Sequence, residues 1–370
     1  MRIGFEAKRY FHNFTGLGNY SRDLIRALAK YHPEHEYYLY NPKKRSDQKI
    51  RLPEQAKEKL PENKFFKKFH HLWRQGMMVN QLKKDDIEVF HGLSGELPNG
   101  LAKNRIPSVV TIHDLIFMRY PSYYNFIDRK IYFQKFKSAA QRADKIVAIS
   151  EQTKKDIIEF LNIKADKIQV IYQGCLPDFK IDYDDGFKSR LRQKYLLPER
   201  FLLYVGSIEA RKNLKNLIKA LPQVNLPLVV VGKKTAYFEE VKQTIEKHHL
   251  DNQVYFPDYL DKKELAALYQ MAEVFVYPSF FEGFGIPIIE ALYSKTPVVT
   301  SQSGCFPEAG GPHSVYVNPE KPASIAKGIV SIVNQPDKRH FMADEGWKYA
   351  QKFNDDVFAQ KWITCYQNII

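Results

Sequence analysis

The sequence predicts an α/β protein built from two doubly wound parallel-sheet domains. Short apolar runs alternate with helical patterns along most of the 370 residues, and this alternation is typical of parallel sheets covered on both faces. The alternation lapses once, at residues 176–186 (LPDFKIDYDDG), where Pro, Asp and Gly cluster. We therefore expect one domain over residues 1–178 and a second over residues 187–350.

Each expected strand is a short apolar run bounded by turn residues. The runs lie at 3–5, 37–40, 109–112, 145–149 and 168–171 in the first domain, and at 201–205, 228–231, 254–256, 274–277 and 298–300 in the second. Between them lie helical spacings such as that of Leu214, Leu217, Ile218 and Leu221. Ligands of such folds bind beyond the carboxyl ends of the strands, so we expect the site in a cleft between the domains.

Composition excludes several protein classes. With 26% charged and 14% aromatic residues the chain is globular. The N-terminus has no signal-peptide pattern, and no run of about 18 apolar residues predicts a membrane-spanning helix. The three cysteines, Cys175, Cys305 and Cys365, are far apart and odd in number, which fits neither a disulfide framework nor a zinc cluster. We expect a cytoplasmic protein with no metal site.

Positive charge is concentrated in the first half of the chain. The net charge of +14 divides into +13 for residues 1–180 and +1 for residues 181–370. Such asymmetry indicates a partner with a dense negative field, either nucleic acid or an anionic membrane surface.

A basic and aromatic segment lies at residues 64–74, after a KKR run at 43–45. Basic groups interleaved with aromatic rings are what an interfacial helix presents to anionic lipid. An ordinary amphipathic helix that packs its aromatic side chains on the sheet gives the same pattern. The residues assigned to a membrane or acceptor surface are Lys64, Phe65, Phe66, Lys67, Lys68, Trp73 and Arg74.

Gly16 and Gly18 lie between the first strand and a helical pattern. Glycines before a helix N-terminus let backbone N–H groups approach a phosphate. The third glycine of the dinucleotide fingerprint is absent, and Asn41-Pro42 follows the second strand in place of an acid for a ribose. A nicotinamide dehydrogenase is therefore not expected, and a plain loop is the alternative to a phosphate site.

His113 comes directly after the expected strand at 109–112, where it faces the expected cleft. There it would hydrogen-bond a ligand, although a lone histidine is more often a structural residue.

Arg211 and Lys212 lie in the segment GSIEARKN, between the strand at 201–205 and a helix that begins near Leu214. Asn213 has the side chain of an N-cap. Two cations beside a helix N-terminus suit a diphosphate. The alternative is a solvated turn.

The strongest motif is FEGFGIPIIEAL at 281–292. Gly283 and Gly285 allow close backbone approach, and Pro287 suits the first turn of a helix. Glu282 lies in the loop and Glu290 in the helix. Eight residues span about 12 Å along a helix, more than the ~5–9.5 Å between the carboxylates of a glycosidase. We therefore expect the glutamates to contact opposite ends of one extended ligand. A capped helix with two surface acids would leave the glycines unexplained.

These motifs carry a family resemblance. The E-x7-E spacing in EGFGIPIIEA, preceded by YPSFF and followed by TPVVTS, occurs with VGSIEARKNL, TIHDL and GLGNYS. Together they resemble the family 4 retaining glycosyltransferases of the GT-B fold, and most of all the mannosyltransferases of bacterial O-antigen and capsule assembly. The resemblance covers essentially the whole chain. It implies two Rossmann-like domains facing a cleft, with a terminal helix at 351–370 that returns to the N-terminal domain.

The resemblance also implies roles for particular residues. The expected catalytic group is Glu282, His113, Arg211 and Lys212, with the two cations on the diphosphate and His113 beside the hexose. Glu282 would act as a hexose contact or as a nucleophile. The donor would be bound by Gly16, Gly18, Arg211, Lys212, Phe284, Gly285, Ile286 and Glu290, of which Glu290 would hold the ribose. One departure is Ser207, where many members carry Arg, and Arg211 would supply that charge.

The remaining expectations concern partners. The resemblance implies a nucleotide-sugar donor, GDP-mannose in preference to a UDP-hexose, and a glycan or lipid-linked saccharide acceptor in cell-surface polysaccharide biosynthesis. It implies no cofactor or metal, no nucleic acid, and a peripheral position on the inner face of the cytoplasmic membrane. The competing hypotheses are a nucleic-acid-binding protein, favoured by charge alone, and a non-catalytic sugar-nucleotide-binding protein.

Overall fold

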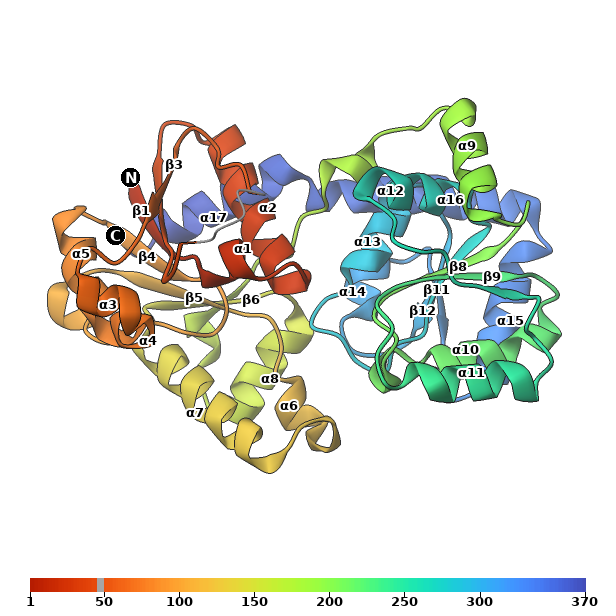
Figure 1. Cartoon of the computed structure of the whole chain (residues 1–370), viewed down its shortest axis with the longest axis horizontal. Helices are drawn as coiled ribbons and strands as arrows, with labels where there is room; N and C mark the ends of the chain where they lie inside the picture. The colour runs from red at the N-terminus through yellow and green to blue at the C-terminus, as the bar shows by residue number, and fades with distance from the viewer. Residues whose placement is uncertain (45–49) are drawn as a thin grey trace. The chain divides into compact units, whose positions relative to one another are not determined.

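The computed structural model describes residues 1–44 and 50–370, which form two compact units (Figure 1). Unit 1 comprises Met1–Gly174 and Phe353–Ile370, and unit 2 comprises Cys175–Lys352. Each unit has its own parallel sheet with helices on both faces, as the alternation of strand and helix predicts. The doubly wound α/β fold is therefore confirmed for both units, whereas the expected cleft between them stays a prediction.

The sheet of unit 1 has seven described strands in the order β3-β2-β1-β4-β5-β6-β7, all parallel. They are β1 (Arg2–Glu6), β2 (Glu36–Tyr40), β3 (Ala56–Lys59), β4 (Val89–Gly92), β5 (Ser108–Ile112), β6 (Lys145–Ala148) and β7 (Ile168–Val170). The strand order reverses between β1 and β4, which makes their carboxyl ends the topological switch point of this unit.

The helices of unit 1 include one that comes from the end of the chain. They are α1 (Lys8–His12), α2 (Gly16–Tyr31), α3 (Lys64–Lys68), α4 (His70–Leu72), α5 (Met78–Lys84), α6 (Ile116–Arg119), α7 (Phe126–Arg142), α8 (Glu151–Leu161) and α17 (Asp355–Gln367). Helix α17 packs on α2, where Trp362 joins Leu24 and Leu28 in one core. Arg26 of α2 donates to Asp355 at 2.9 Å, and the Tyr366 hydroxyl lies 2.8 Å from Nδ1 of His91 in β4.

The sheet of unit 2 has six described strands in the order β10-β9-β8-β11-β12-β13, again all parallel. They are β8 (Leu202–Val205), β9 (Leu228–Val231), β10 (Val254–Tyr255), β11 (Val274–Tyr277), β12 (Val298–Ser301) and β13 (Val315–Val317). The helices are α9 (Asp185–Tyr195), α10 (Leu214–Ala220), α11 (Phe238–Lys247), α12 (Lys262–Met271), α13 (Ile286–Tyr293), α14 (Phe306–Gly310), α15 (Pro322–Val333) and α16 (Pro336–Ala350). The switch point lies between β8 and β11.

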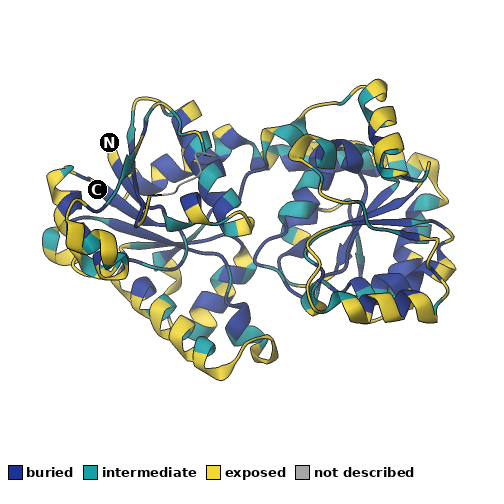
Figure 2. Cartoon of the chain, in the orientation of Figure 1, coloured by how far each residue is buried: buried dark blue, intermediate teal, exposed yellow. Residues whose placement is uncertain are grey.

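Burial follows this layering. Most strands of both sheets are buried, with β3 at one edge as an exception, and exposed residues lie mainly on the helices and loops (Figure 2). All ten expected strands are present within two residues of their expected ends. Three strands were not predicted: β3 is a charged edge strand (AKEK), β4 (VFHG) ends in His91 and Gly92, and β13 is the segment VYV. In the described part of the chain, no helix combines the length and apolarity that crossing a bilayer requires.

Candidate functional site at the unit 2 switch point

The two strongest sequence motifs meet at the carboxyl ends of neighbouring strands. Strand β8 pairs directly with β11. The segment 206–213 follows β8, and the segment 278–285 follows β11. Both therefore emerge at the switch point, where open α/β sheets bind ligands. The sequence does not indicate that these two segments contact each other, but in the structure their side chains do.

Glu282 forms ion pairs with both cations of the other segment. Its Oε2 lies 2.8 Å from Nη1 of Arg211, and its Oε1 lies 2.6 Å from Nζ of Lys212. The hydroxyls of Tyr277 and Ser279 also donate to Oε1, at 3.0 and 2.8 Å. Burial raises the pKa of Glu282, but Lys212 and Arg211 outweigh it, so this pKa lies at about 2. Glu282 is thus a buried, ionised carboxylate with two cationic partners.

The two cations are held by further contacts. Lys212 donates to the hydroxyl of Tyr277 at 2.6 Å and lies 5.2 Å from the centroid of that ring. Arg211 donates to the backbone carbonyl of Phe281 at 2.6 Å and to Glu209 at 2.7 Å. Their side chains are 12% and 17% exposed. Because these contacts already hold both cationic side chains in place, the side chains need little further ordering when an anion binds.

Asn213 joins the two segments, but not as the side-chain N-cap that the sequence predicts. It occupies the N-cap position of α10 with φ at +60° and makes no side-chain capping bond. Its amide instead donates to the carbonyls of Pro278 and Pro319, at 2.9 and 2.7 Å. The left-handed backbone turns the side chain away from the helix, so this prediction was wrong.

Helix α13 begins at the glycine-rich motif, as expected. Gly285 is its N-cap residue with φ at +127°, and Pro287 lies in the first turn. The thiol of Cys305 contacts the carbonyl oxygens of Glu282 and Phe284 and so holds the loop from behind. Pro287 has no N–H and the N–H of Ile288 donates to the carbonyl of Gly285 at 2.9 Å. An anion at this turn would therefore meet the helix dipole and the backbone around Gly285 and Ile286.

Glu290 lies inside α13 and has different surroundings from Glu282. The hydroxyl of Tyr269 donates to its Oε2 at 3.0 Å. Burial raises the pKa of Glu290 to about 7, against the lowering effects of Tyr269 and Lys262. The two glutamates therefore contact different groups, which agrees with separate roles rather than a shared one.

In unit 1, His113 follows β5 at the carboxyl edge of the sheet, and both of its ring nitrogens have partners. Nε2 donates to the carbonyl of Leu93 at 2.9 Å, and the amide of Gln173 donates to Nδ1 at 3.3 Å. The edge of the Tyr20 ring contacts it, with centroids 4.6 Å apart. Burial lowers the pKa of His113 to about 4, so it is neutral near pH 7.

Gly16 and Gly18 lie in the first turn of α2, not before it as the sequence analysis expected. A Cβ at Gly18 would lie 1.7 Å from the carbonyl oxygen of Asn13, so this glycine is required by packing. A Cβ at Gly16 would have no neighbour within 4 Å. Of these two glycines, Gly16 is therefore the one that borders open space, which a ligand could fill.

The basic and aromatic segment is divided between surface and core. Lys64, Phe65, Lys67 and Lys68 are exposed, and Phe66 is partly buried against the core. Trp73 is fully packed, with its ring 6.3 Å from that of Tyr40. Arg74 bonds to Glu6 at 2.7 Å and to Glu96 at 2.9 Å.

The assignment of Trp73 and Arg74 to a membrane surface was therefore wrong. The reason is that the segment is not one continuous helix: α3 ends at Lys68, the backbone of Phe69 is not helical (φ −104°, ψ 52°), and α4 begins at His70, so Trp73 does not continue the exposed face of α3. Of the basic run at 43–45, Lys43 and Lys44 are exposed, and Arg45 lies outside the described residues.

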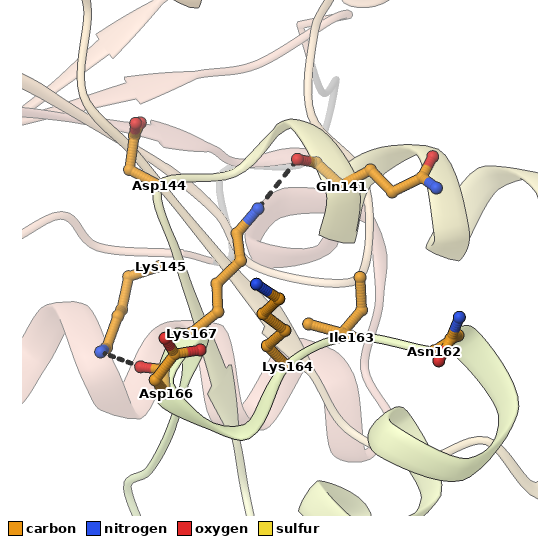
Figure 3. A pocket seen from close by; sticks show the side chains of 8 residues that line it. All are labelled: Gln141, Asp144, Lys145, Asn162, Ile163, Lys164, Asp166 and Lys167. Atoms are coloured by element: carbon orange, nitrogen blue, oxygen red, sulfur yellow. Dashed lines mark hydrogen bonds between the residues drawn. The ribbon is translucent and has the colours of Figure 1, made fainter.

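A cavity of about 550 Å³ lies at the opposite edge of the unit 1 sheet, near the amino ends of β6 and β7 (Figure 3). Lys145 and Lys167 line it, but each donates to a backbone carbonyl, of Asp166 and Gln141 respectively. These two lysines therefore link neighbouring loops at the amino-end edge of the sheet, on the opposite side from the switch point. The described residues contain no group of three or more His, Cys, Asp or Glu side chains arranged to hold a metal.

Comparisons with known proteins identify both halves of the chain. Residues 14–178 match the family model "Glycosyltransferase Family 4", and residues 187–349 match "Glycosyl transferases group 1". The chain is 27% identical over 387 residues to the O-antigen chain mannosyltransferase B of Escherichia coli, across 99% of this chain and 100% of the relative.

Solved structures agree with this assignment at the level of the fold. Sucrose-phosphate synthase from Thermosynechococcus elongatus superposes with a TM-score of 0.81 at 21% identity, over 100% of this chain and 98% of that one. HepE of Anabaena, solved in complex with UDP and glucose, gives a TM-score of 0.76 at 18% identity, over 100% of both chains. Both family models describe glycosyltransferases, and together they match nearly all of the chain. The protein is therefore an enzyme of the glycosyltransferase class that combines a domain of Glycosyltransferase Family 4 with a domain of Glycosyl transferases group 1, as two Rossmann-like domains of the GT-B type.

Proposed function

We propose that this glycosyltransferase moves a hexose, mannose in the first instance, from a nucleoside-diphosphate sugar to a glycan or lipid-linked saccharide of a cell-surface polysaccharide. The observation that carries the donor assignment is the placement of Arg211 and Lys212 opposite Glu282 at the unit 2 switch point. The mannosyltransferase name of the full-length Escherichia coli relative supports mannose and an O-antigen acceptor.

Positive charge at this site suits the leaving group. Departure of the sugar leaves negative charge on the diphosphate, which Arg211, Lys212 and the N-terminal turn of α13 would neutralise. Removing one preorganised donor of this kind raises a barrier by ~3–4 kcal/mol. These cations supply the charge that a metal ion would otherwise bring, so we expect EDTA to leave activity unchanged.

Glu282 would then change partners during the reaction cycle. In the structure it occupies both cations, and a diphosphate would compete for them. Its ionised oxygens would then accept hydrogen bonds from hydroxyls of the hexose. We favour retention by same-face attack, in which the acceptor oxygen bonds to the anomeric carbon as the phosphate leaves and takes the acceptor proton.

The proposal includes further contacts with the donor. Glu290 would accept both ribose hydroxyls, the first turn of α13 at Phe284, Gly285 and Ile286 would contact the hexose, and Gly16 would approach the phosphates. His113 is neutral, and its Nε2–H donates to the carbonyl of Leu93. It would therefore line the hexose pocket as an uncharged side chain.

The donor base is the finer question, since HepE was solved with UDP. Thermal-shift titration with GDP, UDP, GDP-mannose and UDP-glucose, with and without EDTA, tests it. A specific ligand at a hundredfold excess over Kd adds about 2.7 kcal/mol of stability, so we expect a clear shift with the guanine ligands only. A shift with uridine ligands alone would instead assign a UDP-hexose donor. Binding without turnover on any acceptor would favour the non-catalytic alternative.

The membrane part of the proposal rests on unit 1. Lys64, Phe65, Lys67 and Lys68 are exposed together, and residues 1–180 carry a net charge of +13. We propose that they attract the inner, anionic face of the cytoplasmic membrane, where lipid-linked acceptors would be met.

A further inference from the structure

A cavity of about 380 Å³ lies within unit 2, at the C-terminal end of α13. Its walls come from residues 180–182 and from helices α9, α12, α13 and α16, which pack on one another (Figure 1). The glycine-rich motif lies at the other end of α13, and neither Glu282 nor Glu290 lines the cavity. The proposed reaction therefore does not use this space.

The wall formed by residues 180–182 is fixed by Gln270 of α12. The Nε2 of Gln270 donates to the carbonyl of Ile181 at 2.7 Å, and its Oε1 accepts the backbone N–H of Tyr183 at 3.2 Å. Because both polar ends of this amide have partners within unit 2, the wall is in place before any ligand binds, as is usual for small-molecule sites.

The cavity is positively charged. Four charged side chains line it, three cations against one acid: Lys180, Lys188, Lys295 and Asp182. In the described part of the chain, Lys188 and Lys295 form no ion pair. The Nζ of Lys295 lies 5.7 Å from the ring centroid of Trp347, which also lines the cavity. Such a cation–π contact orients the ammonium group but leaves its positive charge available to an anion.

A buried hydroxyl in the cavity lining has no partner. Ser294 follows the last residue of α13 and is 5% exposed, and its Oγ makes no hydrogen bond among the described residues. Leaving a buried hydroxyl unpaired destabilises a fold, so an orphan hydroxyl beside a cavity points to an acceptor that a ligand supplies. In a cavity with excess positive charge, that acceptor would be an anionic oxygen.

The lysines are not needed to cap α13. Cations stabilise the C-terminus of a helix by themselves, but the last turn of α13 already has backbone donors. Three of its carbonyls accept N–H groups at 2.9–3.1 Å: those of Glu290, Ala291 and Leu292. Capping would also leave the cavity and the hydroxyl of Ser294 unexplained.

We propose that this cavity is a second ligand site, which takes a phosphate monoester of a small sugar. Lys188, Lys295 and the hydroxyl of Ser294 would bind the phosphate through charge-assisted hydrogen bonds. Trp347 and Ile181 are 40% and 50% exposed, and they would give the sugar an apolar surface. The site is independent of the donor assignment at the switch point, and each is tested separately.

Calorimetric titration of the full chain with mannose 6-phosphate tests the proposal, with inorganic phosphate and mannose as comparison ligands. We expect mannose 6-phosphate to bind more tightly than either. The variant K188Q/K295Q should weaken its binding by about tenfold or more, because the phosphate loses two charged donors. The matched control K247Q/K327Q removes two exposed lysines elsewhere in unit 2 and should bind like wild type.

Ser294→Ala separates binding from folding. Because the hydroxyl has no partner within the protein, its removal should leave the unfolding temperature of the ligand-free protein at or above that of wild type. Affinity for mannose 6-phosphate should nevertheless fall by about tenfold. A lower unfolding temperature with unchanged affinity would show that the hydroxyl serves the fold and does not contact the ligand.

Lys212→Ala distinguishes the cavity from the switch point, and mannose 6-phosphate binding should persist in it. If binding is lost there and retained in K188Q/K295Q, the phosphate binds at the donor site and the cavity is not a ligand site. Equal weakening in K188Q/K295Q and K247Q/K327Q would mean that net charge alone is responsible.

The comparison ligands decide what the cavity takes. If inorganic phosphate binds as tightly as mannose 6-phosphate, the ligand is phosphate itself and the sugar assignment is wrong. If wild type binds neither, the second site does not exist, whereas nucleoside-diphosphate binding at the switch point remains a separate measurement.

Discussion

The ammonium group of Lys212 lies 2.6 Å from the carboxylate of Glu282, which brings together residues from segments that follow two different strands. The same carboxylate also meets Arg211. Because Glu209 also pairs with Arg211, two cations and two carboxylates balance within the site. A diphosphate that binds here, as we propose, would compete with Glu282 for the cations.

Removing Lys212 should depress turnover more than donor binding. In Lys212→Ala the leaving diphosphate loses one preorganised cation, and we expect kcat to fall by about 10²–10³-fold. Initial-rate kinetics with a fixed acceptor give the measurement. The matched control is Lys215→Ala, a neighbouring lysine that pairs with Glu240 and should retain wild-type kcat. Equal kcat in both variants would remove Lys212 from the mechanism.

The ionised carboxylate of Glu282 should stabilise the fold, so this stabilisation should be lost at acidic pH. Its pKa lies at about 2 in the folded protein, below the ordinary 4.5, so its contribution is present above pH 4.5 and is lost as the pH falls towards 2. The difference corresponds to about 3 kcal/mol at neutral pH.

Urea unfolding at several pH values tests this contribution. Wild type should exceed Glu282→Gln in stability at neutral pH, and the gap should close as the pH approaches 2. A gap that does not depend on pH would show that packing, rather than charge, is responsible.

Donor binding should depend on pH through Glu290. Only the ionised carboxylate accepts both ribose hydroxyls, and its pKa is about 7, so affinity should rise from about pH 6 to 8 and then level off. Calorimetric titration with nucleoside diphosphate measures the profile. Tyr269→Phe removes the hydroxyl that bonds to the carboxylate, so the rise should move to higher pH. Glu290→Gln should abolish it, and a rise that persists there would assign the titration to another group.

The two glycines of α2 should separate stability from binding. Gly18→Ala places a Cβ against the Asn13 carbonyl at 1.7 Å, so we expect it to destabilise unit 1 by about 1–3 kcal/mol. Gly16→Ala enters open space, so the thermal midpoint should stay close to that of wild type while donor affinity falls. Wild-type donor affinity in folded Gly16→Ala would exclude an approach of phosphate to this turn.

Asn213 should be a structural link between the segments that carry the site. Asn213→Gly keeps a backbone suited to φ of +60° but leaves the Pro278 carbonyl without its amide donor, whereas the Pro319 carbonyl keeps the amide of Asn216 at 3.1 Å. We expect a loss of about 1–3 kcal/mol in unfolding free energy. Asn213→Asp, which cannot donate, should lose at least as much. If Asn213→Gly has the unfolding free energy of wild type, water has replaced the amide as the hydrogen-bond donor.

Local patterns predicted most strands and the position of the motifs at strand ends, because buried parallel strands and glycine-rich motifs leave strong signals in a single sequence. They did not predict β4, which ends in His91 and Gly92, or the pairing of β8 with β11. Partners such as Tyr277, Tyr269, Cys305 and Gln173 were missed because their contacts join residues far apart in the chain. Trp73 was misassigned because the assignment rested on the basic and aromatic composition of residues 64–74, which does not reveal that the helix breaks at Phe69.

The packing of α17 on α2 has a consequence for biosynthesis. Unit 2 is one continuous segment, Cys175–Lys352, whereas unit 1 needs residues from both sides of it. As the chain leaves the ribosome, unit 2 is complete before Trp362 exists, and until then the Leu24 and Leu28 face of α2 lacks its cover. Domains generally fold as units during synthesis, so we expect unit 2 to mature first and the nascent N-terminal half to be the segment that needs chaperone protection.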